Sequence, residues 1–192
     1  RAAFPRAELC AADRSEASLA LARRRCAGLE RVVLGLQTGP RLPIPGPFDL
    51  IFAAHVFHHI PPPERPAILT MLRGALSAAG DLLLFEHNPW NPLTARAVRR
   101  CPLDRDARLL SAPEARRLAL QAGFERTKIR FHVFLPGWLA PLLPLERALG
   151  LLPLGAQYSL WAKPGRRPAA DAAQGRSEER RGGKECRSRW SP

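Results

Sequence analysis

The chain of 192 residues is long enough for one domain of ordinary size and too short for two full ones. Hydrophobic residues make up 46% of it and charged residues 24%, a balance typical of globular proteins that excludes a wholly disordered or fibrous chain. No apolar run reaches the roughly 18 residues that a membrane-spanning helix needs, so none is expected.

The net charge of +13 raises nucleic acid or an anionic membrane as a partner. However, aromatic residues are not interleaved with the basic ones, as single-strand binding would favour. Part of the charge lies in residues 176–192 (RSEERRGGKECRSRWSP), which resemble a translated sequencing-library adapter with one departure, Gly182 in place of Val. We therefore expect no nucleic-acid partner and a disordered tail at 164–192. The alternative is a genuine basic tail that binds nucleic acid.

The four cysteines form no CxxC pair and have no histidines at metal spacing. This predicts neither a structural zinc site nor a disulfide framework, so we expect no metal. Reduced thiols and a cytoplasmic location are the simplest expectation.

The hydrophobic pattern predicts alternating strands and helices. Residues 37–47, rich in proline and glycine, predict a loop, Gly80 is expected to stop a helix, and Gly123 lies just past another helix. In chain order we expect a strand at 7–12, a helix at 15–25, strands at 30–36 and 48–54, a helix at 64–76, a strand at 81–86, a helix at 113–122, and strands at 125–134 and 156–162. This alternation predicts an α/β fold, a mostly parallel sheet with helices on both faces.

In such sheets, ligands bind beyond the carboxyl ends of the strands. Asp13, the pair Ala54–His55 and the pair Glu86–His87 follow or end three predicted strands. The sequence therefore predicts that these residues lie along one edge of the sheet.

Three segments resemble class I S-adenosylmethionine-dependent methyltransferases. Residues 4–15 (FPRAELCAADRS) resemble their second strand with its terminal acid, residues 48–60 (FDLIFAAHVFHHI) the fourth-strand motif, and residues 71–86 (MLRGALSAAGDLLLFE) the helix, turn and fifth strand. The resemblance covers about residues 1–163. It implies a Rossmann-like fold, methyltransferase activity and S-adenosylmethionine as cofactor.

The sequence departs from the family pattern at two places. The family's first strand and Gly-rich loop are expected before Arg1, so the resemblance implies a partial domain at 1–163 that lacks its first strand and is inactive by itself. Gln37, Thr38 and Gly39 stand where an acidic residue often meets the adenine amino group. Thr38 is expected to accept that hydrogen bond instead.

The resemblance implies a cofactor-binding set. Asp13 is expected to accept hydrogen bonds from both ribose hydroxyls, as acids after the second strand of dinucleotide folds do. The alternative for Asp13 is a helix N-cap, for which Ser15 is an equal candidate. The full predicted set is Asp13, Arg14, Thr38, Ala54 and His55.

Three histidines, His55, His58 and His59, follow the strand at 48–54. A neutral imidazole can take a proton from an acceptor hydroxyl or amine, so His55 and His59 are the catalytic candidates. Alternatively these side chains are polar lining or core histidines, and alignment in a dry site suffices for transfer. We do not expect His58 and His59 to bind a metal, because adjacent residues rarely point the same way.

Two further segments are candidates for binding the methyl acceptor. Residues 86–92 (EHNPWNP) contain two X-Pro pairs and are expected to form an extended, turned loop that binds the acceptor or merely connects a strand to a helix. The apolar segment 133–145 is broken by prolines. Four roles are possible for this segment: a lid, an acceptor pocket, a membrane-surface contact or a packed crossover loop.

Together these observations predict methyl transfer from S-adenosylmethionine to an oxygen, nitrogen or carbon nucleophile of a small-molecule or lipid-like acceptor. One alternative is a nicotinamide-dependent oxidoreductase, which needs a Tyr-x-x-x-Lys pair or similar, whereas Tyr158 has Ala162 four residues later. A non-catalytic Rossmann-like binding domain is the other alternative. The oligomeric state does not follow from the sequence.

Overall fold

The computed structural model describes residues 7–39, 41–135, 144 and 146–165. The chain divides into two compact units, residues 1–46 and residues 47–192. The predicted tail at 164–192 lies outside the described residues except for Pro164 and Gly165, as does most of the apolar segment 133–145. None of the helices in the described part of the chain is long and apolar enough to span a membrane.

The first unit is a β-α-β arrangement. Strand β1 (Leu9–Asp13) and strand β2 (Val32–Leu36) pair in parallel, with Asp13 opposite Leu36, and helix α1 (Glu16–Arg25) connects them. Helix α1 begins where predicted, because the Ser15 side chain accepts a hydrogen bond from the backbone N–H of Ser18. Acidic Glu16 in its first turn and three arginines in its last turn complement the helix dipole.

The second unit is built on a four-stranded sheet with the order β3-β4-β6-β5. Strand β3 pairs with β4 in parallel, whereas β6 is antiparallel to both of its neighbours. Short 3-10 turns lie at 57–59, 62–64 and 102–104. The elements are β3 (Phe48–Ala54), α2 (Arg65–Ala75), β4 (Leu76–His87), α3 (Pro92–Arg100), α4 (Ala112–Gln121), β5 (Phe124–His132), α5 (Glu146–Leu149) and β6 (Gln157–Pro164).

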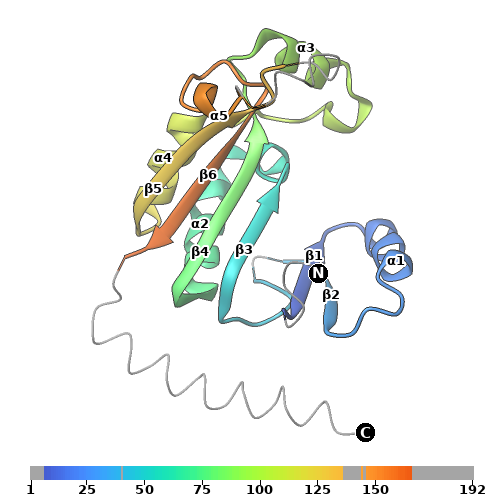
Figure 1. Ribbon diagram of the computed structural model, residues 1–192. Helices are drawn as coiled ribbons and strands as arrows, with labels where there is room; N and C mark the ends of the chain where they lie inside the picture. Colours follow the sequence, from blue (N-terminus) through green and yellow to red (C-terminus); the bar gives the residue numbers. More distant parts are fainter. Residues whose placement is uncertain (1–6, 40, 136–143, 145, 166–192) are drawn as a thin grey trace, which may run out of the picture. The chain divides into compact units, whose positions relative to one another are not determined.

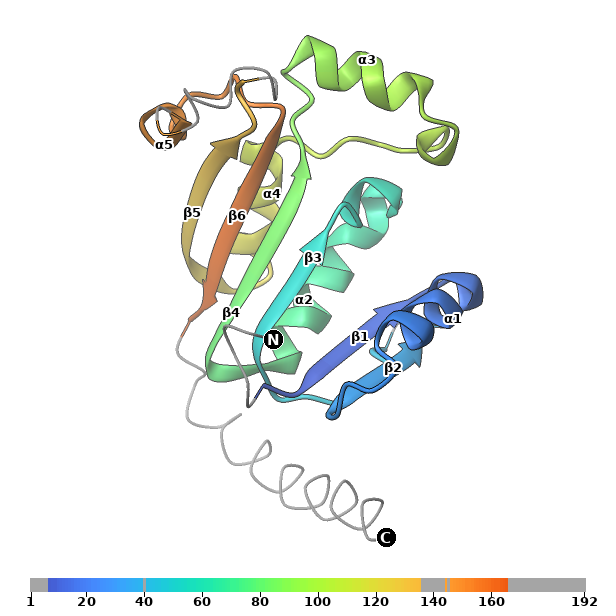
Figure 2. The ribbon, with the colours of Figure 1, turned by 45° about the vertical axis from the view of Figure 1, so that its right-hand side comes forward.

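Helices α2 and α4 pack against one face of this sheet (Figure 1). Alternate residues of the central strands point into this layer and are fully buried, as the two-residue period of a strand requires. The core includes Leu69, Leu72, Leu82, Leu84, Leu118, Tyr158 and Leu160. The view in Figure 2 shows the carboxyl ends of β3 and β4 pointing the same way, which sets where a site can form.

Most predicted elements are confirmed, with three corrections. The predicted mostly parallel sheet is mixed in the second unit, because β6 runs antiparallel to both β4 and β5. Gly80 does not stop a helix: helix α2 ends at Ala75, and Gly80 lies inside strand β4, where a Cβ atom would stand 2.6 Å from the Phe48 carbonyl oxygen. Helix α3 was not predicted, although Pro92 at its first turn and the Asn91 cap favour it. Gly123, just past α4, has φ +89° and confirms the predicted helix end.

Candidate active site

The two parallel strands β3 and β4 end side by side, and the turns that follow them gather a cluster of histidines and acids. The His55 backbone N–H continues the ladder by donating to the Phe85 carbonyl at 2.8 Å. The cluster, which we call the histidine cluster, consists of His55, His58, His59, Glu86, His87 and Asp104.

Glu86 organises the turn after β3. Its Oε1 accepts hydrogen bonds from the backbone N–H groups of Val56, at 3.0 Å, and Phe57, at 2.7 Å. Its Oε2 lies 2.6 Å from Nδ1 of His58, and both side chains are 1% exposed. Every contact of this buried carboxylate is therefore with a donor, which offsets the cost of burying its charge.

His58 lies between two carboxylates. Its Nδ1 meets Glu86, and its Nε2 lies 3.5 Å from Oδ1 of Asp104. Burial alone would lower the pKa of His58, but the hydrogen bond to Glu86 and the charges of Glu86 and Asp104 outweigh it and raise the pKa. Burial pushes the pKa of Asp104 upward, yet the Cys101 hydrogen bond and the nearby histidines lower it overall.

His59, a predicted catalytic residue, points to the same acid. Its Nε2 lies 3.4 Å from Oδ1 of Asp104, and its ring centroid is 4.2 Å from that of His58. With 46% of its side chain exposed, His59 forms the open side of the cluster. The expectation that two adjacent histidines point apart is thus wrong here, because the 3-10 turn at 57–59 directs both rings to Asp104.

His55, the other predicted catalytic residue, has an unusual backbone. Its φ of +55° is in the left-handed region, which costs free energy at a residue with a side chain. Its buried Nδ1 has no hydrogen-bond partner among the described residues, and its Nε2 lies 3.4 Å from the Gln157 amide nitrogen, a long contact. Strain and an unsatisfied ring nitrogen together mark His55 as a candidate functional residue.

His87 stacks near His55, with the ring centroids 4.3 Å apart. Burial, followed by the charges of His55 and His58, lowers the pKa of His87. The lowered pKa keeps His87 neutral at neutral pH, so His87 places no positive charge beside the ring of His55.

The segment 86–92 serves the fold more than the predicted acceptor binding. Asn88 is fully buried and donates to the carbonyls of Pro153, at 2.9 Å, and Gly155, at 2.8 Å. Asn91 caps α3 by accepting from the backbone N–H groups of Leu93 and Thr94. Trp90, at 52% exposed, is the large side chain of this segment that is open to an acceptor.

The predicted cofactor residues of the first unit lie at the carboxyl ends of its two strands. The Gln37 N–H donates to the Asp13 carbonyl at 2.8 Å, which holds the segment carrying Thr38 beside Asp13. The Asp13 Oδ1 accepts from the backbone N–H of Ser15 at 2.8 Å, so this carboxylate supports the start of α1 while the cap itself is Ser15. Asp13, Arg14 and Thr38 are all exposed.

Ala54 and His55, the remaining residues of the predicted cofactor set, belong to the second unit, at the end of β3. Sequence reasoning missed two members of this neighbourhood, Asp104 and Gln157. Asp104 comes from the turn at 102–104, and Gln157 begins β6. Neither residue follows the carboxyl end of a strand. The prediction that functional residues lie at those ends therefore could not identify them.

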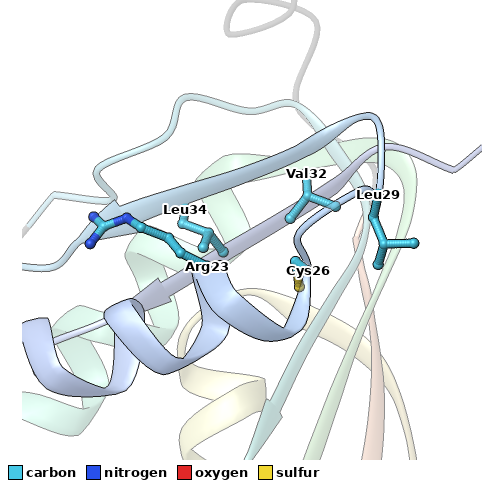
Figure 3. Close-up of a pocket in the computed structure, with 5 residues that line it drawn as sticks. All are labelled: Arg23, Cys26, Leu29, Val32 and Leu34. Atoms are coloured by element: carbon cyan, nitrogen blue, oxygen red, sulfur yellow. The ribbon is translucent and has the colours of Figure 1, made fainter.

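A pocket of about 280 Å³ lies elsewhere in the first unit, between α1 and β2 (Figure 3). It is lined by Arg23, Cys26, Leu29, Val32 and Leu34. Val32 is the first residue of β2, whereas Thr38 follows the end of that strand. None of the predicted cofactor residues of the first unit, Asp13, Arg14 and Thr38, lines this pocket.

Comparisons with known proteins bear on the class of the chain. Residues 1–80 match a family model described as a methyltransferase domain. A comparison with curated proteins finds no significant match.

Solved structures share the fold at low sequence identity. A methyltransferase of Thermotoga maritima, described as a possible histamine N-methyltransferase, is 18% identical with a TM-score of 0.61, over 81% of this chain and 72% of that one. One from Archaeoglobus fulgidus is 15% identical with a TM-score of 0.59, over 80% and 75%. PigF, solved with SAH, is 21% identical with a TM-score of 0.59, over 84% of this chain and 45% of that one.

Residues 1–80 thus resemble a methyltransferase domain, and the chain shares the fold of solved S-adenosylmethionine-dependent methyltransferases. The Rossmann-like α/β fold class that the sequence predicts is confirmed by these structures.

Proposed function

We propose that this chain is an S-adenosylmethionine-dependent methyltransferase that acts on an oxygen or nitrogen nucleophile of a small-molecule acceptor. In this proposal, His55 takes the proton from that nucleophile. S-adenosylmethionine supplies an electrophilic methyl group on a sulfonium. The observation that carries the proposal is His55 itself, held in a left-handed backbone conformation at the carboxyl end of β3 beside the lowered-pKa His87.

The proton acceptor in this proposal is Nε2 of His55. The Gln157 amide N–H points to Nε2 at 3.4 Å, which leaves the lone pair on Nε2 and the hydrogen on the buried Nδ1. A contact of that length is weak and exchangeable. An acceptor O–H or N–H would replace the amide and give its proton to Nε2, while S-adenosylmethionine would supply the methyl group and leave as the thioether.

The first unit supports a role in holding the nucleoside. Asp13 and Thr38 are exposed side by side at the strand ends, where a carboxylate and a hydroxyl can accept hydrogen bonds from ribose hydroxyls and from an adenine amino group. Arg14, next to Asp13, completes the set that we propose for the cofactor in the first unit.

The test is His55→Asn in the full-length protein, because asparagine tolerates the left-handed backbone and cannot act as a base at neutral pH. With phenol, catechol and primary amine acceptors, we expect kcat to fall about 10²–10⁴-fold while the affinity for S-adenosylmethionine is unchanged. His132→Gln, a histidine of β5 outside the histidine cluster, is the matched control. Equal kcat in His55→Asn and the native protein would contradict the proposal.

A further inference from the structure

We propose that His58, His59 and Asp104 form a binding site for a divalent transition metal ion of the zinc class. These three residues each offer one ligand atom, and the three atoms lie within 4.8 Å of one another. We assign Nε2 of each histidine and Oδ1 of the aspartate as the ligands, because each Nε2 faces that oxygen. This goes beyond methyl transfer and does not depend on the role of His55.

The first argument is the state of His58. Both oxygens of Glu86 face donors, Oε1 two backbone N–H groups and Oε2 the Nδ1 of His58 at 2.6 Å. The proton of a neutral His58 therefore resides on Nδ1, and its Nε2 carries a lone pair that faces the Asp104 carboxylate. A carboxylate that fixes the tautomer and orientation of a histidine is the usual second layer of a protein metal site.

The second argument is distance. The separations from Asp104 Oδ1 to the two Nε2 atoms, 3.5 and 3.4 Å, exceed an ordinary hydrogen bond. Ligands at about 2.0–2.1 Å from a tetrahedral zinc ion stand roughly 3.3–3.4 Å apart. One carboxylate oxygen facing two imidazole nitrogens at this spacing fits a shared metal better than two hydrogen bonds.

The third argument is the frame that holds the ligands. The Arg108 backbone N–H donates to the His58 carbonyl at 2.7 Å, which ties the segment carrying Asp104 to the turn after β3. Arg65, 1% exposed, joins the same two segments by donating to the carbonyls of Ile60 and Arg108. The ligands are thus preorganised, and half-exposed His59 leaves a side open for entry of the ion and for a fourth ligand.

Another cluster, His55, His58 and Glu86, also has metal-ligand spacing. We do not favour it, because the lone pairs of Glu86 already accept from the two backbone N–H groups and from His58. In the competing account no ion binds: His58 is positively charged between Glu86 and Asp104, and both histidines pair with the Asp104 carboxylate.

The experiment titrates the chelator-treated full chain with Co²⁺ and then Zn²⁺ at pH 7.5 to 8, following the visible absorption of cobalt. We expect one Co²⁺ per chain with the intense bands of a tetrahedral site, displaced by Zn²⁺. Asp104→Asn, close in shape to the native residue, should weaken the affinity more than the roughly 10–100-fold that second-layer substitutions cost. His59→Gln, at a half-exposed position, should do the same.

Asp106→Asn removes the same charge two residues away, at an exposed position, and should bind cobalt as the native chain does. No stoichiometric binding, or equal affinity in Asp104→Asn and Asp106→Asn, would overturn the proposal. A thiolate-to-cobalt absorption band that Cys101→Ser abolishes would overturn it too, since the metal would then be held by cysteine. All these readouts are independent of methyltransferase activity.

Discussion

Two residues at the ends of β3 and β4 differ in how their polar groups are satisfied. Glu86 has three donors on one buried carboxylate, while His55, one strand away, has a strained backbone and a ring nitrogen without a partner among the described residues. Glu86 thus has a structural role in the site, whereas His55 is available to react. Satisfied polar groups stabilise the fold, whereas unsatisfied, strained ones are retained where function needs them.

His132 gives a pH dependence that can be assigned to one residue. It is half-buried, its Nε2 meets the Ser159 hydroxyl at 2.8 Å, and its pKa is lowered by burial, with the Glu146 charge opposing and the Arg130 charge adding to that shift. The unfolded chain therefore takes up this proton at a higher pH than the folded one. Well above pH 6.5, His132 is neutral in both states and has no effect on the unfolding free energy. As the pH falls through 6.5, the unfolded chain binds the proton first and the unfolding free energy decreases.

We accordingly expect His132→Gln, which keeps a hydrogen-bonding side chain, to show a smaller loss of unfolding free energy than the native chain between about pH 7 and pH 5. Urea unfolding at a series of pH values measures this difference, and the remaining histidines cancel because both proteins contain them. Parallel stability curves for the two proteins would show that His132 is not responsible.

At the scale of elements, one side chain of β4 connects two strand ends. The Glu86 carboxylate holds the turn after β3 through the Val56 and Phe57 N–H groups and fixes His58. In Glu86→Gln, the amide oxygen can keep the backbone bonds, but the amide nitrogen then faces the His58 Nδ1–H, donor against donor. We expect the variant to lose about 1–3 kcal/mol of unfolding free energy.

Urea denaturation checks this expectation, with Glu64→Gln as the matched control at an exposed position next to α2. The control should change the unfolding free energy by no more than about 0.5 kcal/mol. If the two variants had the same midpoint, Glu86 would not hold the turn as described.

The strands were the most predictable elements. Strand β3 has the predicted bounds, 48–54, because its near-continuous apolar run has no competing period. Helix α3 was missed because a proline has two meanings. It disfavours a helix at the residue before it, but it is also common in the first turn of a helix, as Pro92 is here. The misplaced Gly80 has a similar cause: glycine also occurs where two backbones approach closely, as here against Phe48.

At the scale of the whole molecule, the sequence was enough to predict the fold class. It was not enough to predict which side chains contact one another in the site. The predicted edge residues follow from strand order, and the fold confirms that β3 and β4 end together. Asp104 joins His58 and His59 only through the path of residues 101–110, which hydrogen bonds of Arg65 and Arg108 determine. Such tertiary contacts leave no local pattern in a sequence.

We propose above all that this chain binds S-adenosylmethionine and that Asp13 accepts hydrogen bonds from the ribose hydroxyls. Calorimetric titration of the full-length protein with S-adenosylhomocysteine tests it most directly, comparing the native protein, Asp13→Asn and Glu16→Gln. Asparagine keeps an oxygen for the Ser15 N–H and loses the charge, and hydrogen bonds to a charged group contribute about 1.5–3 kcal/mol each. We predict 1:1 binding that Asp13→Asn weakens at least tenfold and Glu16→Gln leaves unchanged. A native protein that does not bind, or an Asp13→Asn variant that binds equally well, would contradict the account.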